Sequence, residues 1–261
     1  MTRNARQGWG DWAQGLVLGC SLLVLTACVD FDFSVPTMDA GGDGQSDGGP
    51  KEKGSCEEVT GLLACSTFEP PMALGPFSVE ERGDAELELT TQRSYSGTQA
   101  VEATLETGGD FAWLEVSVGN LSKGSVWFRA MVLLEDELES ATFVTMASLE
   151  SEQEGYVDLG MGRNFLSMYS GQADESWMST PLALHGSWTC LEWEIQFGDG
   201  AAGDKMALWR DGMLLKEAPS AETTPSPAYH RARIGVSAED PLAVTFYFDD
   251  VAVATDRIGC P

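Results

Sequence analysis

The stretch FYFDDVAVATDRIGC, residues 246–260, is an apolar run near the end of the chain that two adjacent carboxylates, Asp249 and Asp250, interrupt. Neighbouring residues on a strand point to opposite faces of the sheet. One of the two carboxylates is therefore expected to face inward, where an unpaired charge is costly. The run predicts a buried closing strand that needs a polar or cationic partner for one of its acids.

Short runs with strand composition or alternation continue through the sequence from Cys56 to Pro261, and turn residues separate them. They span residues 85–91, 100–106, 112–118, 125–134, 141–149, 156–162, 165–170, 187–197, 205–210, 213–217, 232–237 and 243–255. Asp211-Gly212 between two of the runs predicts a tight hairpin. No segment of useful length has the helical period. The pattern predicts an all-β domain, an antiparallel β-sandwich or jelly roll.

The charge of the chain excludes one class of partner. Its 261 residues carry 41 acids against 15 bases, a formal net charge of −26. Such a surface repels nucleic acid and anionic lipid headgroups, and the sequence has no long Lys/Arg cluster to overcome the repulsion. We therefore expect no nucleic-acid partner.

The N-terminus resembles the signal peptide of a bacterial lipoprotein. Arg3 and Arg6 precede a twelve-residue apolar run, Leu16–Ala27, which is too short to span a bilayer. The run ends in Leu25-Thr26-Ala27-Cys28, which is similar to the lipobox of that family. The resemblance implies cleavage after residue 27 and lipidation of Cys28. The alternative is an ordinary secretory signal in which Cys28 has no role.

Residues 28–55 predict a disordered tether that holds the domain away from the membrane. Gly, Asp and Ser dominate from Asp39 onward, so the segment cannot bury enough apolar surface to offset its ordering entropy. The resulting organisation is a signal peptide (1–27), a lipidated tether (28–55) and a β-sandwich domain (56–261). Because Val29 rather than Asp follows the cysteine, the lipoprotein resemblance implies sorting to the outer membrane, with the lipid anchor as the only membrane contact.

Three signatures in the domain stand in the order found in jelly-roll carbohydrate-binding modules. They are ACSTFEP (64–70), RSYSGTQAVEA (93–103) and FYFDDVAV (246–253). The order resembles the concanavalin A-like jelly roll of lectins, glucanases and a glucuronan-lyase-like group, over nearly all of residues 56–261. In the binding modules the opening Glu, the Ser-Gly turn and the closing Asp hold a structural calcium. The resemblance implies calcium ligands at Glu69, Ser96 and Asp249, and the alternative is that the acids accept backbone N–H bonds.

Four cysteines remain in the domain and predict two disulfides. They are Cys56, Cys65, Cys190 and Cys260. If Glu69 lies opposite Asp249, as the resemblance implies, Cys56 comes near Cys260 and Cys65 is left for Cys190. A local Cys56–Cys65 loop with Cys190–Cys260 is equally compatible with the sequence, and the pairing stays open.

A set of polar and aromatic residues is predicted to line a concave, ligand-binding face. The set consists of Arg129, Trp188, Glu192, Glu194, Tyr229 and Arg231. Stacking and charge-assisted hydrogen bonds from such residues would suit a sugar or a uronate. The alternative is a solvated sheet face with ion pairs.

No catalytic residue is predicted. The strand around Glu192 and Glu194 lacks the E-x-D-x-x-E pattern of the glucanases of this fold, and neither lyase signature, Q-x-H or Y-x-K-x-G-x-Y, occurs. We therefore expect a surface lipoprotein that binds carbohydrate or envelope glycan without cleaving it. A polysaccharide lyase or glycoside hydrolase is the first alternative, and a structural envelope protein without a sugar ligand is the second.

Overall fold

The computed structural model describes residue 56 and residues 59–106, 110–139, 142–152, 155–171, 174–179, 184–198, 204–218, 227–240 and 242–261. The predicted signal peptide, the lipidation site Cys28 and the tether up to residue 55 lie outside these ranges. Within them, no helix has the length and apolar character needed to cross a bilayer.

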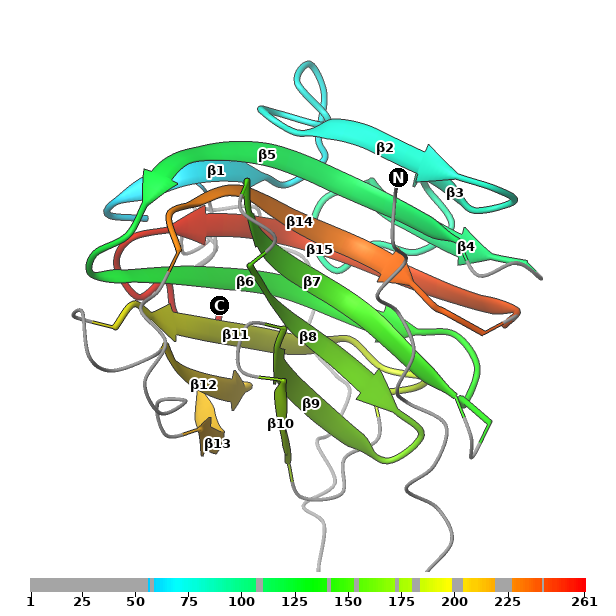
Figure 1. Cartoon of the computed structure of the whole chain (residues 1–261). Coiled ribbons are helices and arrows are strands. Elements are labelled where there is room, and N and C mark those ends of the chain that lie inside the picture. Colours follow the sequence, from blue (N-terminus) through cyan, green and yellow to red (C-terminus); the bar gives the residue numbers. More distant parts are fainter. Residues whose placement is uncertain are drawn as a thin grey trace, which may run out of the picture. The chain divides into compact units, whose positions relative to one another are not determined.

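The described residues form strands in two antiparallel sheets that face each other (Figure 1). Sheet A has the order β13-β12-β11-β6-β15-β4-β3, with β1 also paired to β15, and sheet B has the order β10-β9-β8-β7-β14-β5-β2. The strands of sheet A are β1 (Leu62–Ser66), β3 (Glu86–Thr90), β4 (Ala100–Leu105), β6 (Ser125–Leu134), β11 (Thr189–Gln196), β12 (Lys205–Arg210), β13 (Met213–Ala218) and β15 (Val244–Ala254). Those of sheet B are β2 (Ser78–Arg82), β5 (Phe111–Leu121), β7 (Phe143–Ser151), β8 (Tyr156–Gly162), β9 (Phe165–Ser170), β10 (Glu175–Met178) and β14 (Tyr229–Ser237).

The predicted all-β sandwich is confirmed, and several strands begin and end at the residues expected from the sequence. The predicted runs at 125–134, 156–162, 165–170 and 205–210 coincide with β6, β8, β9 and β12. The hairpin between β12 and β13 turns at Asp211 and Gly212, which both have positive φ, as a type I′ turn requires. Sequence patterns missed β1, β2 and β10, which are only four or five residues long.

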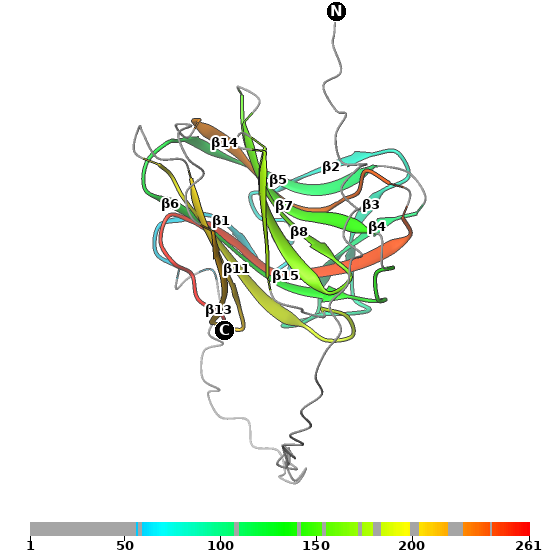
Figure 2. The same ribbon diagram turned by 60° about the horizontal axis from the view of Figure 1, so that its bottom comes forward.

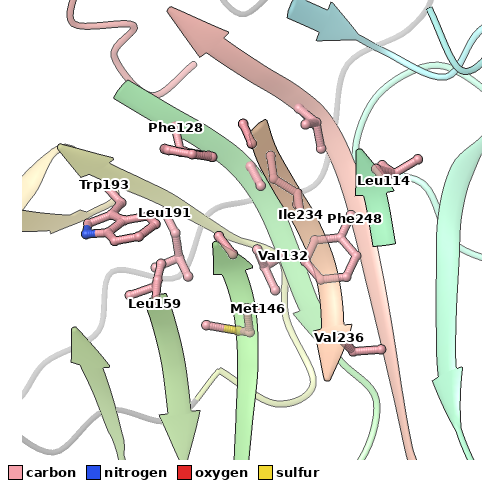
Figure 3. Packing of buried hydrophobic residues seen from close by; sticks show 14 of the residues in the cluster. Leu114, Phe128, Val132, Met146, Leu159, Leu191, Trp193, Ile234, Val236 and Phe248 are labelled. Atoms are coloured by element: carbon pink, nitrogen blue, oxygen red, sulfur yellow. The ribbon is translucent and has the colours of Figure 1, made fainter. Parts of the chain in front are cut away.

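The core lies between the two sheets and is built from alternate residues of each strand. Leu114 and Ile234 from sheet B face Val132 and Phe248 from sheet A (Figure 3). Trp193 is 1% exposed and packs at 5.2 Å, centroid to centroid, from Phe128. Leu191, Ile195 and Phe197, which alternate along the chain with Trp193, belong to the same core.

A bulge in β15 divides this strand into two halves with different neighbours. Residues 244–248 pair with β4, and residues 251–254 pair with β1, while β6 follows the other edge with a register shift between Asp249 and Ala252. Asp250, in the bulge, has a φ of 46°. Figure 2 shows the same strand, coloured orange to red, from a second direction. The bulge places both acids where β15 exchanges β4 for β1.

Candidate functional site

Asp249 and Asp250 hold the loop that leads into β4. Both side chains are buried, with exposures of 0% and 4%. Asp249 Oδ2 accepts hydrogen bonds from the backbone N–H groups of Tyr95 (2.8 Å) and Ser96 (3.0 Å), and its Oδ1 accepts from the N–H of Asp250 (2.8 Å). The hydroxyl of Ser96 donates to Asp250 Oδ1 at 3.1 Å. Phe248 and Val251 face the core on either side of the bulge, so the expectation that one acid points inward is wrong. Both acids are instead buried beneath this loop, where N–H and O–H groups of residues 95 and 96 donate to them.

Glu69 holds the other half of the same loop. Its Oε1 accepts from the backbone N–H groups of Thr98 (2.6 Å) and Gln99 (2.8 Å), and its Oε2 accepts from the Thr98 hydroxyl (2.8 Å). These bonds, above all that from the Thr98 N–H, lower the pKa of Glu69. Glu69 and Asp249 thus bond to neighbouring residues of one loop, Asp249 to Ser96 and Glu69 to Thr98 and Gln99, and their role as calcium ligands with Ser96 stays a prediction.

The contacts of these acids bear on the predicted calcium site. Calcium takes six to eight oxygen ligands, and the described residues hold no group of three Asp, Glu, His or Cys side chains arranged for a metal. The two carboxylates instead accept hydrogen bonds, which is the alternative stated from the sequence. One observation fits a cation: burial, with the nearby Asp250 charge adding to it, raises the pKa of Asp249 to about 6. A cation bound by Glu69 and Asp249 would offset that cost, and calcium stays a prediction.

The disulfide pairing left open by the sequence is Cys56–Cys65 and Cys190–Cys260. The register between the first and last strands is close to the one assumed, with Ser66 opposite Val251. The chain turns at Gly61, at a positive φ, so Cys56 returns toward Cys65 instead of continuing along β15. The alternative with Cys56 near Cys260 is therefore wrong.

Arg129 and Glu192 lie on the outer face of sheet A but do not face solvent. Arg129 is 2% exposed and donates from Nε to the Asp250 carbonyl oxygen at 3.1 Å, and Glu192 is 0% exposed. Glu192 accepts from Arg257 Nη2 at 3.0 Å and from the Gly259 N–H at 2.7 Å. The prediction that these two residues contact a ligand needs correction, because both are buried, and the segment after β15 contacts Glu192.

Arg257 also contacts two tryptophans. Its guanidinium carbon lies 4.8 Å from the ring centroid of Trp209 and 5.6 Å from that of Trp127, in cation–π contact. The Cys190–Cys260 disulfide fixes the end of the same segment beside β11. We call residues 255–261 the C-terminal latch.

The other predicted ligand residues are divided among different surfaces. Tyr229 is fully buried in the core, and its hydroxyl donates to Asp204 Oδ2 at 2.5 Å, so its predicted ligand role is also corrected. Glu194 accepts from the Ser125 hydroxyl on sheet A. Half-buried Trp188 packs edge-on against exposed Tyr95, with 6.2 Å between ring centroids. Only Arg231 lies on the outer face of sheet B, so the set forms no single site.

The outer face of sheet B carries an ion-pair network that the strand register builds. Arg233, whose side chain is 12% exposed, contacts Glu115 Oε2 (3.0 Å), Glu150 Oε1 (2.5 Å) and Glu80 Oε2 (2.6 Å). Arg231 contacts Glu115 at 3.2 Å and Glu150 at 4.0 Å. The predicted alternative of a sheet face with ion pairs therefore describes this surface.

Tyrosines continue this face on the neighbouring strands. Tyr156 lies opposite Glu150, and Tyr169 lies opposite Asp158, with 5.8 Å between the two tyrosine ring centroids. The Tyr169 hydroxyl donates to Asp174 Oδ1 at 3.0 Å, and its pKa is raised by burial and by that bond. Sequence reasoning missed both tyrosines, although the alternation in YVDLGMG places Tyr156 and Asp158 on the polar face.

No protein-family model matches the chain, and no curated protein matches its sequence. Solved structures do share its fold. The chain is similar to the cellulose-induced protein Cip1, with 18% identity and a TM-score of 0.62 over 76% of this chain and 99% of that one. It is similar to an endo-β-1,4-glucuronan lyase from the fungus Trichoderma reesei, with 15% identity and a TM-score of 0.53 over 69% of this chain and 90% of the lyase.

A third similar structure is from botulinum neurotoxin type C, with 11% identity and a TM-score of 0.53 over 76% of this chain and 48% of that chain. At these identities the comparisons show the fold alone. They confirm the jelly roll and the predicted resemblance to the glucuronan-lyase-like group.

Proposed function

We propose that the chain is an envelope lipoprotein whose jelly-roll domain binds a polysaccharide or cell-surface glycan without cleaving it, through the outer face of sheet B. The observation that carries the proposal is the register of this face. One row contains Glu115, Arg233, Ser148, Asp158 and Tyr169 on five adjacent strands. With neighbouring strands about 4.8 Å apart, such a row covers about 19 Å, a surface suited to several sugar units.

Fixed polar groups favour binding on this face. Arg233 is held by three carboxylates and Arg231 by two, so neither needs to be ordered when a ligand arrives. Sugar hydroxyls are both donors and acceptors, and they match a surface of alternating carboxylates, guanidinium groups and serine hydroxyls. Among the structural neighbours, one is named for acting on glucuronan and another for interacting with two ganglioside molecules.

The same network is poorly suited to lyase chemistry. A lyase neutralises the carboxylate of its uronate substrate with a free cation or amide and needs a nearby base. Here Arg231 and Arg233 are already paired with Glu80, Glu115 and Glu150. Both lyase signatures are also missing from the sequence. Binding without cleavage is therefore the better supported reading.

The cellular setting of the proposal comes from the sequence. Lipid on Cys28 would anchor the chain at the bacterial envelope, in the outer membrane, and residues 29–55 would extend the domain from the surface. A structural calcium held by Glu69 and Asp249 would fix the loop at residues 95–99, away from the glycan face.

The test is affinity electrophoresis of the full mature chain, carrying Cys28→Ser for solubility, in gels containing neutral polysaccharides or uronate polymers. We expect retardation by at least one polysaccharide and its loss in Arg231→Ala, whereas Leu214→Ala, an exposed change on β13 of sheet A, serves as the control. Ultraviolet absorbance of unsaturated products from uronate polymers would instead indicate a lyase. If neither retardation nor a product is observed, the structural envelope role is the remaining alternative.

A further inference from the structure

Three glycines at or beside the outer face of sheet B lie beneath aromatic rings. A Cβ on Gly160 would lie 2.7 Å from Phe143 Cε1, and one on Gly162 would lie 2.6 Å from Phe165 Cε1. A Cβ on Gly171, just after β9, would lie 2.8 Å from Tyr156 Cδ1. Each ring therefore occupies the space that a side chain would take, and packs on bare backbone.

These rings also remain open to solvent. Phe143 is 37% exposed and Tyr156 is 36% exposed, which is high for large aromatic side chains on a sheet. Phe165 is half-buried and lies across Gly162 from Phe143, and Tyr169 is half-buried beside Tyr156. A ring supported by backbone and open outward is a rigid stacking surface, since it loses little side-chain entropy when a ligand binds.

The rings form two groups at the opposite ends of β8. Gly162 lies at one end of this strand, opposite Phe143 and Phe165, and Tyr156 lies at the other. The Phe143 ring lies over Gly160, four residues along β8 from Tyr156, so the two groups are separated by about 13 Å. We call the surface between them, with the rings at both ends, the β8 strip.

Small and polar residues fill the middle of the β8 strip. Asp158 is half-buried and lies between Ser148 of β7 and Tyr169 of β9. Ser148 and Ser167 are each 4% exposed, and Gly160 has no side chain. The Phe143 ring covers Gly160 and both serines are buried, so the half-buried Asp158 carboxylate is the polar group of the β8 strip that lies at the surface between the two groups of rings.

The charges around the β8 strip determine which kind of glycan suits it. Tyr156 lies opposite Glu150, and Tyr169 bonds to Asp174. At the other end Arg163 is already paired with Glu137 at 3.0 Å. The described residues around the strip are thus mainly acidic, and the whole chain carries a formal net charge of −26. A uronate or sulfated chain would be repelled, whereas a neutral sugar would offer hydroxyl donors to the carboxylates.

We propose that the β8 strip binds a neutral polysaccharide that runs along β8, with one pyranose ring on the Phe143–Phe165 pair and another on the Tyr156–Tyr169 pair. This inference rests on the proposed glycan-binding function and gives it a ligand class and a direction. The C–H groups of a pyranose ring pack on the face of an aromatic ring, and the Asp158 carboxylate between the platforms accepts its hydroxyl hydrogens.

The test is isothermal titration of the full mature chain, with Cys28→Ser, using neutral gluco- and manno-oligosaccharides of increasing length and uronate oligosaccharides of equal length. Affinity is expected to rise with the length of the neutral ligand until it covers both platforms. Phe143→Ala and Tyr156→Ala should each weaken the longest ligand about three- to tenfold, and the double variant more. Both side chains are over a third exposed, so these variants should keep the parent melting temperature.

Two controls separate this inference from the proposed function. Gly160→Ala should lower affinity by displacing the Phe143 ring, whereas Leu214→Ala on sheet A should leave affinity unchanged. If Arg231→Ala abolishes binding but both ring variants bind like the parent, the β8 strip is refuted while glycan binding stands. Tighter binding of uronates than of neutral sugars refutes the ligand class. If no saccharide binds the parent chain, both proposals fail.

Discussion

A fully buried carboxylate needs donors, and Asp249 has three backbone N–H groups from residues 95, 96 and 250. Charge-assisted bonds of this kind favour the ionised form, while burial and the charge of Asp250 favour the protonated form. Burial has the larger effect, and the pKa rises to about 6. Asp249 therefore bonds to the loop, but its ionisation above about pH 6 lowers the stability of the folded state.

The pH dependence of stability should reveal this cost. The folded pKa of about 6 is above the ordinary value of 3.8, so the folded state keeps its proton at pH values where the unfolded chain has lost it. The contribution is full below about pH 4 and is lost as the pH rises through 6, by roughly 3 kcal/mol. The free energy of unfolding in urea, measured from pH 4 to 7 without calcium, should fall by about this amount in the parent relative to Asp249→Asn. If the difference in free energy of unfolding between parent and variant does not change with pH, the raised pKa of Asp249 is contradicted.

Calcium should change that behaviour if Glu69 and Asp249 hold it. Bound calcium would lower the pKa of Asp249 and stabilise the folded state according to its concentration. We expect a lower melting temperature in a chelator than in millimolar calcium, and no calcium effect in Asp249→Ala. Glu217→Ala, at an exposed acid on β13, the opposite edge of sheet A from β4, should keep the parent response. Equal melting of the parent with and without chelator would remove calcium from the proposal.

The C-terminal latch shows how a short segment can bury an acid on the outer face of a sheet. Glu192 is 0% exposed, and one of its oxygens accepts from Arg257 and the other from the Gly259 N–H. The latch contacts account for the burial of Glu192, which explains why this residue, predicted as a ligand contact, is not available to a ligand.

Arg257→Ala should therefore destabilise the domain more than loss of an exposed ion pair. The variant removes one donor of Glu192 and the cation–π contacts to two tryptophans, at an expected cost of about 1–3 kcal/mol. The matched control is Arg163→Ala, whose ion pair with Glu137 is exposed on both sides and should contribute at most about 1 kcal/mol. Chemical denaturation of both variants measures the difference. Equal losses would show that the latch pair adds nothing beyond a surface contact.

Alternation and turn residues predicted most strands, because β6, β8 and β12 each combine an apolar face with clear turn signals. β2 (SVEER) and β10 (ESWM) are short edge strands without a clear apolar alternation; β2 pairs with β5, about thirty residues further on, and β10 pairs with the preceding strand β9. The candidate site was harder to predict. Arg129 and Arg231 follow the same alternating pattern, yet they lie on opposite outer faces of the sandwich. Local periodicity gives the side of a strand, whereas the assignment of strands to sheets depends on long-range pairing.

At the scale of the whole molecule, the fold separates the proposed glycan face, on sheet B, from the outer face of sheet A, where the C-terminal latch contacts buried Glu192. The structure describes only the domain, and the sequence supplies the proposed anchor. A chain with a net charge of −26 would stay extended from an anionic membrane surface, since like charges repel over a Debye length. The orientation of the proposed binding face relative to the membrane would then depend on the tether and not on contact with the lipid.

Lipidation of Cys28 is expected to control where the protein is found. Cys28→Ser should move the chain from the membrane fraction to the soluble periplasmic fraction and abolish incorporation of labelled palmitate. Cys20→Ser lies in the same apolar run and should leave both unchanged, because that residue is removed with the signal. Membrane fractionation with palmitate labelling checks the outcome. If the parent protein is found in the soluble fraction, residues 1–27 are an ordinary secretory signal and Cys28 is not lipidated.

The Cys56–Cys65 disulfide has a mechanical consequence for a tethered domain. A pulling force that enters from the N-terminal side of Cys56 passes through the sulfur atoms to Cys65, which lies in β1 opposite Ala252. Residues 57–64 are bypassed, so they add no length under load. The force is delivered directly to a strand that is hydrogen-bonded to β15, and the domain should resist being peeled from its end when the bound glycan and the membrane move apart.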